Sequence, residues 1–181
     1  KVTVADSTKE KLFHPKEYQL YIGRILLLII IGFMQSALIC LGDLFFLGIQ
    51  CKHPVMFVLT GMFTSFVYVN LIYALTVSFG DIGKAIAVVL MVMQVAGSGG
   101  TFPIQCAPKF FQVVYPLLPF THSMNAMREC IAGFYGTTYA TELGKLAIFL
   151  VPSLLLGLLL RKPIIKMNEA FMEKLESTHL I

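Results

Sequence analysis

The residue types that could support chemistry gather where an apolar run ends in the segment Ala-Gly-Ser-Gly-Gly-Thr-Phe-Pro, residues 96–103. A serine between glycines can serve as a nucleophile, and a glycine-rich loop can hold a phosphate group. Both uses need partners that the sequence does not supply, because no histidine stands near the serine and no GxxxxGK[ST] motif is present. Since glycine frees the backbone and proline ends a helix, we interpret this segment as a structural hinge. Its hinge residues are Gly97, Ser98, Gly99, Gly100 and Pro103.

Four other polar residues stand in or beside apolar sequence, namely Gln35, Asn70, Gln94 and Arg128. An amide inside a membrane bonds to a neighbouring helix or lines a substrate path, and both roles stay open for Gln35 and Asn70. Gln94 lies one turn before the glycines, so we expect its side chain to satisfy carbonyls that the helix break frees. Arg128 can anchor its helix at the membrane surface, or bind a lipid phosphate or a carboxylate.

Motifs of catalysis and metal binding are absent from the sequence. It contains no HExxH, no GxSxG and no pair of acids placed for hydrolysis. We therefore expect no enzymatic activity, no catalytic residue, no cofactor and no metal. The four cysteines have no metal-like spacing and are expected to be free thiols, although a disulfide among Cys51, Cys106 and Cys130 stays open. The basic residues form no cluster, which argues against a nucleic-acid partner.

The elements that position these residues are predicted to be membrane helices. Of the 181 residues, 57% are hydrophobic and only 13% are charged, and the mean hydropathy is +0.79. Apolar runs long enough to cross a bilayer predict spans at about 21–47, 55–79, 83–102 and 143–160. The third run reaches spanning length only by including the glycine-rich break.

Residues 103–135 are apolar but interrupted by prolines, and each piece is too short to cross a membrane. They predict a helical hairpin that dips into the outer leaflet and returns. Residues 1–20 are interpreted as a cytosolic juxtamembrane segment and residues 161–181 as an amphipathic cytosolic tail. With both termini in the cytosol, only Lys52, Lys109, Arg128 and Lys145 of the 14 Lys and Arg residues lie outside. The predicted fold is thus an all-α integral membrane domain with four spans and one outer re-entrant hairpin.

Four blocks of sequence resemble the C-terminal membrane domain of the YhgE/Pip family, which carries the name phage infection protein. The blocks are residues 96–104, 108–111, 116–121 and 125–129, and the resemblance extends over the chain from about Lys16. The family belongs to the ABC-2-type permease superfamily. The resemblance implies a permease fold in the bacterial plasma membrane, commonly dimeric, with a re-entrant hairpin before the last span. It also implies a span, an ectodomain and a further span upstream of this sequence.

Two functions follow from that resemblance. The first is export of a hydrophobic or envelope-related substrate by a homodimer that a separate cytosolic ATPase drives. The ATPase would contact residues 7–20 or the turn at 80–84. The alternative is a membrane anchor and dimerisation domain of a cell-surface receptor or secretion scaffold. In that case a bacteriophage protein would adsorb to the upstream ectodomain.

Overall fold

The computed structural model describes residues 17–100 and 103–159, and within them the chain forms helices and no strands. This confirms the all-α prediction. The long helices are α1 (Glu17–Phe45), α2 (Pro54–Phe79), α3 (Asp81–Gly97), α5 (Pro119–Ala132) and α6 (Thr138–Ile148). Shorter elements are η1 (Ile104–Cys106), α4 (Lys109–Val114), η2 (Tyr115–Leu117), α7 (Leu150–Leu154) and the π-helical turn η3 (Leu155–Leu159). The predicted tail at 161–181 and most of the juxtamembrane segment at 1–20 lie outside the described residues.

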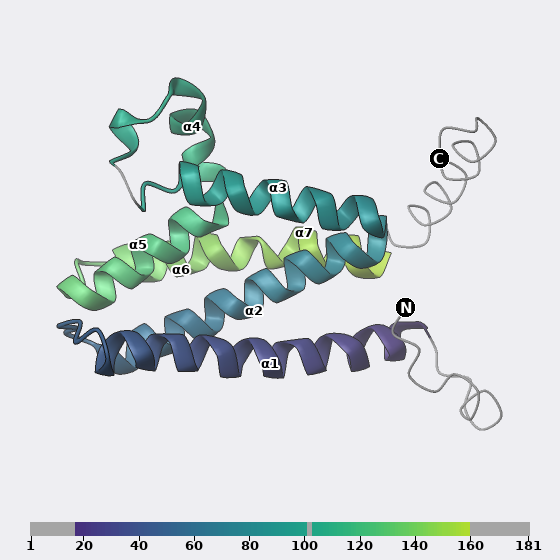
Figure 1. Cartoon of the computed structure of the whole chain (residues 1–181), viewed down its shortest axis with the longest axis horizontal. Coiled ribbons are helices and arrows are strands. Elements are labelled where there is room, and N and C mark those ends of the chain that lie inside the picture. Colours follow the sequence, from purple (N-terminus) through teal and green to yellow (C-terminus); the bar gives the residue numbers. More distant parts are fainter. Residues whose placement is uncertain (1–16, 101–102, 160–181) are drawn as a thin grey trace.

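Helix α2 is the centre of the bundle, since it contacts α1, α3, α5, α6 and α7. The helices α1, α2, α3 and the α6–α7 pair lie alongside one another (Figure 1). The beginning of α1, the α2–α3 turn and η3 lie at one end, which we call the terminal end. The α1–α2 loop, α4 and the C-terminus of α5 lie at the other, which we call the hairpin end.

Three described segments are long and apolar enough to cross a membrane: Ile22–Phe45, Pro54–Phe79 and Thr138–Gly157. The apolar helix Ile82–Gly97 is shorter. It ends before the predicted limit at 102, because Gly99 adopts a φ of 66°. A left-handed residue just beyond the last turn is a common helix stop, and glycine adopts it at little cost. The count of four spans therefore stays a prediction.

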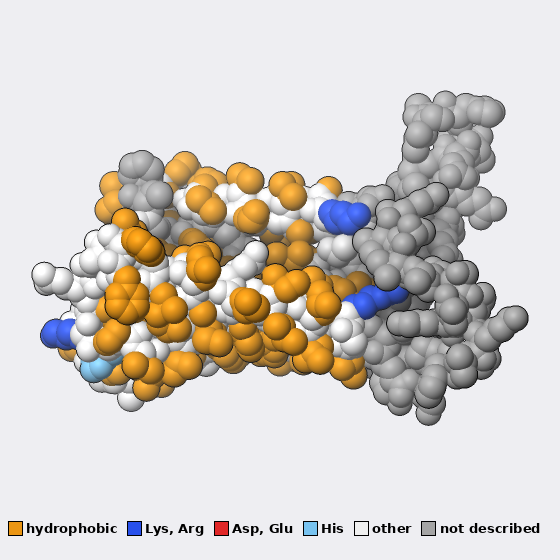
Figure 2. Space-filling view, turned by 60° about the horizontal axis from the view of Figure 1, so that its bottom comes forward, with side chains coloured by type: hydrophobic (Ala, Val, Ile, Leu, Met, Phe, Trp, Pro, Cys, Tyr) orange, Lys and Arg blue, Asp and Glu red, His pale blue; other side chains and the backbone are white. Residues whose placement is uncertain are grey.

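The distribution of side chains is that of a protein surrounded by lipid. Large apolar side chains point outward from α1 and α3, and Figure 2 shows hydrophobic side chains over most of one face, with Lys and Arg at its two ends. Polar side chains lie inside instead, and Thr60, Asn70 and Ser78 of α2 are nearly fully buried. A water-soluble protein rarely exposes so large an apolar surface. The prediction of an integral membrane protein therefore agrees with the structure.

The α6–α7 segment begins at Thr138, five residues before the predicted start of the last span at 143. The additional residues include Glu142, which is buried against other polar groups inside the bundle. The segment is interrupted after Ile148 because Pro152 has no N–H to donate to the carbonyl of that residue. The Ser153 hydroxyl instead donates to the carbonyl of Phe149 at 3.0 Å.

The C-terminus of α5 is capped by the α1–α2 loop. The backbone N–H groups of Lys52 and His53 donate to the carbonyls of Ile131 and Cys130 at 3.3 and 3.1 Å. The last carbonyls of a helix have no partner within the helix, so this loop supplies one. The His53 ring also stacks on Phe134 with ring centroids 4.2 Å apart. These contacts fix one end of α5 to the rest of the bundle.

All four cysteines are free thiols, as expected, and the structure shows no disulfide among Cys51, Cys106 and Cys130. Cys40 and Cys130 are buried, whereas Cys106 is exposed on η1. The Cys51 thiol donates to the carbonyl of Cys130 at 3.2 Å. The sulfur of Cys51 therefore serves as a hydrogen-bond donor at the capped end of α5.

Candidate functional site

The glycine-rich hinge and Arg128 meet at the hairpin end. Arg128 extends from α5, and its Nη2 donates to the carbonyl of Gly99 at 2.7 Å. Its Nη1 makes a longer contact of 3.5 Å with Oδ1 of Asn125, one turn earlier on the same helix. Two features that the sequence singled out separately, 29 residues apart, are thus brought into contact.

A pocket of about 340 Å³ lies at this contact. It is lined by Gly99, Gly100, Pro103, Ile104, Gln105, Tyr115 and Arg128. Arg128 is exposed, and among the described residues no carboxylate lies within ion-pair distance of its guanidinium. The pocket therefore carries a positive charge without a counter-charge in that part of the chain.

Gly97, at the end of α3, lies close to Phe111 and Leu118 of the predicted hairpin. Gly97 is buried, and a Cβ at its position would lie 2.9 Å from Cδ1 of Phe111 and 3.0 Å from Cδ1 of Leu118. The neighbouring Ser98 is also buried, and its hydroxyl has no hydrogen-bond partner among the described residues. The absence of a side chain at Gly97 thus lets α3 end directly against the hairpin.

The three amides of the prediction are not brought together. Gln94 is buried, and its Oε1 accepts a hydrogen bond from the Tyr68 hydroxyl, which joins α3 to α2. This contact differs from the expected bond to carbonyls freed at the break. Asn70 is buried and donates to the carbonyl of Phe66 in its own helix at 2.8 Å. Gln35 is exposed on α1. Asn70 and Gln94 therefore face the interior of the bundle, and Gln35 faces away from it.

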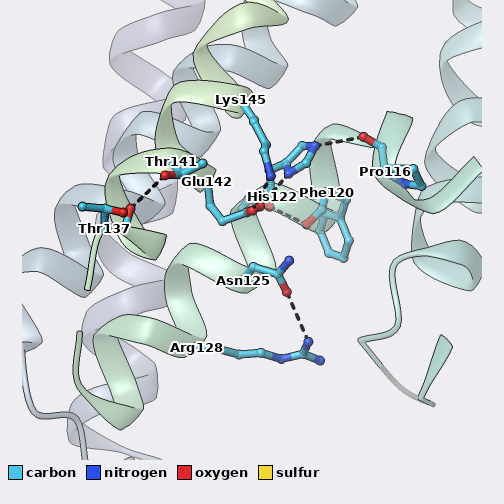
Figure 3. Close-up of polar contacts among 10 residues, drawn as sticks. Pro116, Phe120, His122, Asn125, Arg128, Thr137, Thr141, Glu142 and Lys145 are labelled. Carbon is cyan, nitrogen blue, oxygen red and sulfur yellow. Dashed lines mark hydrogen bonds and ion pairs between the residues drawn. The ribbon is translucent and has the colours of Figure 1, made fainter. Parts of the chain in front are cut away.

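A cluster of ionisable side chains that the sequence did not reveal joins α5 to α6. His122 lies on the first turn of α5, and its Nδ1 is 2.6 Å from Oε2 of Glu142 on α6. Its Nε2 is 3.1 Å from the carbonyl of Pro116. Lys145 donates to Oε1 of Glu142 at 2.8 Å. Figure 3 shows the imidazole between the carboxylate and the Pro116 carbonyl.

Each of the two contacts of the His122 ring needs one hydrogen between its two heavy atoms. The Pro116 carbonyl accepts only, so Nε2 of His122 carries a hydrogen. A second proton lies between Nδ1 and the carboxyl group of Glu142, on either atom. His122 is 5% exposed and Glu142 is 8% exposed, so water reaches neither group well. The network therefore holds the start of α5 against α6 and η2.

The sequence could predict only one of the two contacts of Glu142 in this cluster. Glu142 and Lys145 are three residues apart, the spacing that places two side chains on one face of a helix. His122 is 20 residues from Glu142 in the sequence, and only tertiary packing brings them together. With its start held by His122 and its end held by the α1–α2 loop, α5 is fixed at both ends. Arg128 lies between these points and is thereby positioned at the pocket.

Within the described residues, no group of three or more His, Cys, Asp or Glu side chains lies close enough to hold a metal ion. The polar residues that line the pocket carry a guanidinium, a phenol and a side-chain amide. Such groups bind and orient a ligand through hydrogen bonds.

Comparisons with known proteins agree with this architecture. Residues 12–159 match the family described as ABC-2 family transporter protein. The uncharacterized protein YhgE of Bacillus subtilis (strain 168) is 30% identical over 132 residues, which are 72% of this chain and 17% of that protein. The chain thus spans less than a fifth of the length of this relative. No solved structure matches the chain. The chain therefore belongs to the ABC-2 transporter family, and its sequence is that of a YhgE/Pip-like permease domain.

Proposed function

We propose that this domain is the transmembrane part of an exporter for a hydrophobic or envelope-related substrate, driven by a separate cytosolic ATPase. The observation that carries the proposal is the pocket beside Arg128 in a domain of the ABC-2 transporter family. A charged group next to an outward apolar surface suits a substrate with both polar and apolar parts. The residues of the hinge would let the hairpin move relative to α3 during transport.

The proposed exporter lies in the bacterial plasma membrane with both termini of the chain in the cytosol and the hairpin end outside. The supporting observation is the excess of Lys and Arg in the sequence near the predicted cytosolic ends. A homodimer would form through α1, whose outward side carries an apolar groove of about 750 Å³ that includes Met34, Leu38 and Phe45. Gln35 is exposed on the same helix and would be the amide nearest to such an interface.

Cysteine labelling tests the orientation. In intact cells, a membrane-impermeant maleimide is expected to label Cys106, because this thiol is exposed at the hairpin end. Cys130 is expected to react only after denaturation, since burial raises the pKa of its thiol and the thiolate is the reactive form. The full-length protein would carry either cysteine alone. Labelling of Cys106 only after cells are permeabilised would place the hairpin end in the cytosol and contradict the orientation.

Co-purification tests for the ATPase. The full-length protein, isolated from its host in mild detergent, is expected to carry an ATPase that mass spectrometry identifies. Substitution of the exposed Ile82 and Lys84 by Glu, in the first turn of α3 beside the α2–α3 turn, is expected to remove most of it. Lys109→Glu at the hairpin end is the matched control and should retain it. If no ATPase accompanies the unaltered protein, or if the turn and control variants behave alike, this part of the proposal is wrong.

An anchor and dimerisation domain for a surface receptor or secretion scaffold is the second candidate function. The observation that favours it is that Asn70 and Gln94 are buried and bonded within the chain, which leaves neither amide facing an open path. Replacing both by Leu distinguishes the two functions. An anchor would keep bacteriophage adsorption to the upstream ectodomain unchanged, whereas an exporter that uses either amide would lose transport.

A further inference from the structure

We propose that the pocket beside Arg128 binds the phosphate group of an anionic amphiphile. The pocket is lined by the Arg128 side chain on one side and by the segment around Gly99 and Gly100 on the other. Because Arg128 donates to the carbonyl of Gly99 at 2.7 Å, its guanidinium is held at the pocket before any ligand arrives. A group held in place loses less conformational freedom on binding than a mobile one.

Some hydrogen-bond donors of the pocket residues have no acceptor among the described residues. A guanidinium has more N–H groups than the two that contact Gly99 and Asn125. Tyr115 and Gln105 also line the pocket, and neither the hydroxyl of Tyr115 nor the side-chain amide of Gln105 has a hydrogen-bond partner among the described residues. A phosphate presents several acceptor oxygens and a negative charge. It therefore matches a guanidinium flanked by an O–H and an N–H donor.

The acidic side chains near α5 are occupied elsewhere. Glu129 accepts a hydrogen bond from the backbone N–H of Tyr135 at 2.7 Å, beyond the C-terminus of the helix. Glu142, on α6, accepts a hydrogen bond from Lys145 and pairs with His122. The counter-charge for Arg128 must therefore come from outside the described part of the chain, and an anionic ligand supplies it.

The surroundings of the pocket indicate that the phosphate is attached to an apolar body. The hairpin elements next to Tyr115 carry large apolar side chains that point outward, with Phe110 58% exposed, Val113 71% and Leu117 69%. These side chains would contact the hydrocarbon part of an amphiphile whose phosphate reaches Arg128. A free phosphate ion would gain nothing from them. This inference requires no transport step, so it holds for an exporter and for an anchor alike.

Lipid retention in native mass spectrometry tests the site. The full-length protein would be reconstituted into vesicles of phosphatidylcholine with equal phosphatidylglycerol, then released into mild detergent. Phosphatidylglycerol is expected to be retained in preference to phosphatidylcholine. Arg128→Gln should lower that preference about tenfold, because it removes charge-assisted hydrogen bonds. Tyr115→Phe removes one hydroxyl without changing the shape of the side chain and should lower it by about threefold.

Lys109→Gln provides the matched control, since Lys109 is an exposed cation of the same hairpin that does not line the pocket. It should leave the preference unchanged. If it lowers the preference as much as Arg128→Gln does, the retention reflects surface charge and the proposal is overturned. Displacement of the lipid by millimolar inorganic phosphate alone would overturn the requirement for an amphiphile. Thermal unfolding of each variant checks that it is folded. If Arg128→Gln does not fold, Tyr115→Phe still tests the site.

Discussion

Replacing His122 by leucine is expected to lower the free energy of unfolding by about 2–4 kcal/mol, because it removes two buried hydrogen bonds and leaves their acceptors without the imidazole. The imidazole is 2.6 Å from the carboxylate of Glu142, and both groups are buried. Leucine leaves the carboxylate with Lys145 alone. It also removes the donor to the carbonyl of Pro116. Reversible unfolding in mixed detergent micelles would measure the change.

Two control variants separate the loss of the pair from a general loss of packing. Lys145→Ala is expected to cost less than about 1 kcal/mol, because the lysine side chain is 48% exposed and its ion pair is weakened by water. The double variant His122→Leu with Glu142→Leu should recover much of the stability, since replacing a whole buried pair by apolar residues is often neutral. A double variant no more stable than His122→Leu alone would show that the contact between His122 and Glu142 is not the source of the effect.

The second large effect is expected at the start of α3, where it packs on the end of α2. Gly83→Ala should lower the free energy of unfolding by about 1–3 kcal/mol through overpacking. A Cβ at this position would lie 2.2 Å from the backbone oxygen of Leu75 and 3.1 Å from Cβ of Phe79. A backbone carbonyl inside a helix cannot rotate away as the end of a side chain can. The start of α3 would therefore have to move away from the last turns of α2.

Gly144→Ala is the matched control for that variant. Gly144 lies within α6, and a Cβ there would meet nothing within 4 Å. Alanine should stabilise the helix by about 0.5–1 kcal/mol, because glycine loses more conformational freedom on folding. The same micelle unfolding experiment compares the two variants. If Gly83→Ala stabilises the protein to a similar degree, the close approach of the two helices at Gly83 is not rigid.

The composition and the apolar runs were enough to predict a helical integral membrane protein. Three of the predicted spans correspond to helices long enough to cross a bilayer, because a bilayer requires long apolar segments whose backbone bonds are internal. The end of the third helix near Gly97 was also predictable, since a run of glycines before a proline stops a helix. The motifs within residues 96–129 indicated the family, and the comparisons confirm that assignment.

Contacts between distant residues were decided only by the tertiary structure. His122 has no feature in the sequence that points to Glu142, and Arg128 has none that points to Gly99. In both cases one partner lies on α5 and the other on a different element, so their approach depends on how α5 packs and not on spacing along the chain. Gln94 shows the same limit, because its distance from the glycines in sequence suggested a capping role, whereas the packing of α3 on α2 places it against Tyr68. Local sequence thus determined which segments are helices and where they stop, and tertiary packing determined which polar groups meet inside them.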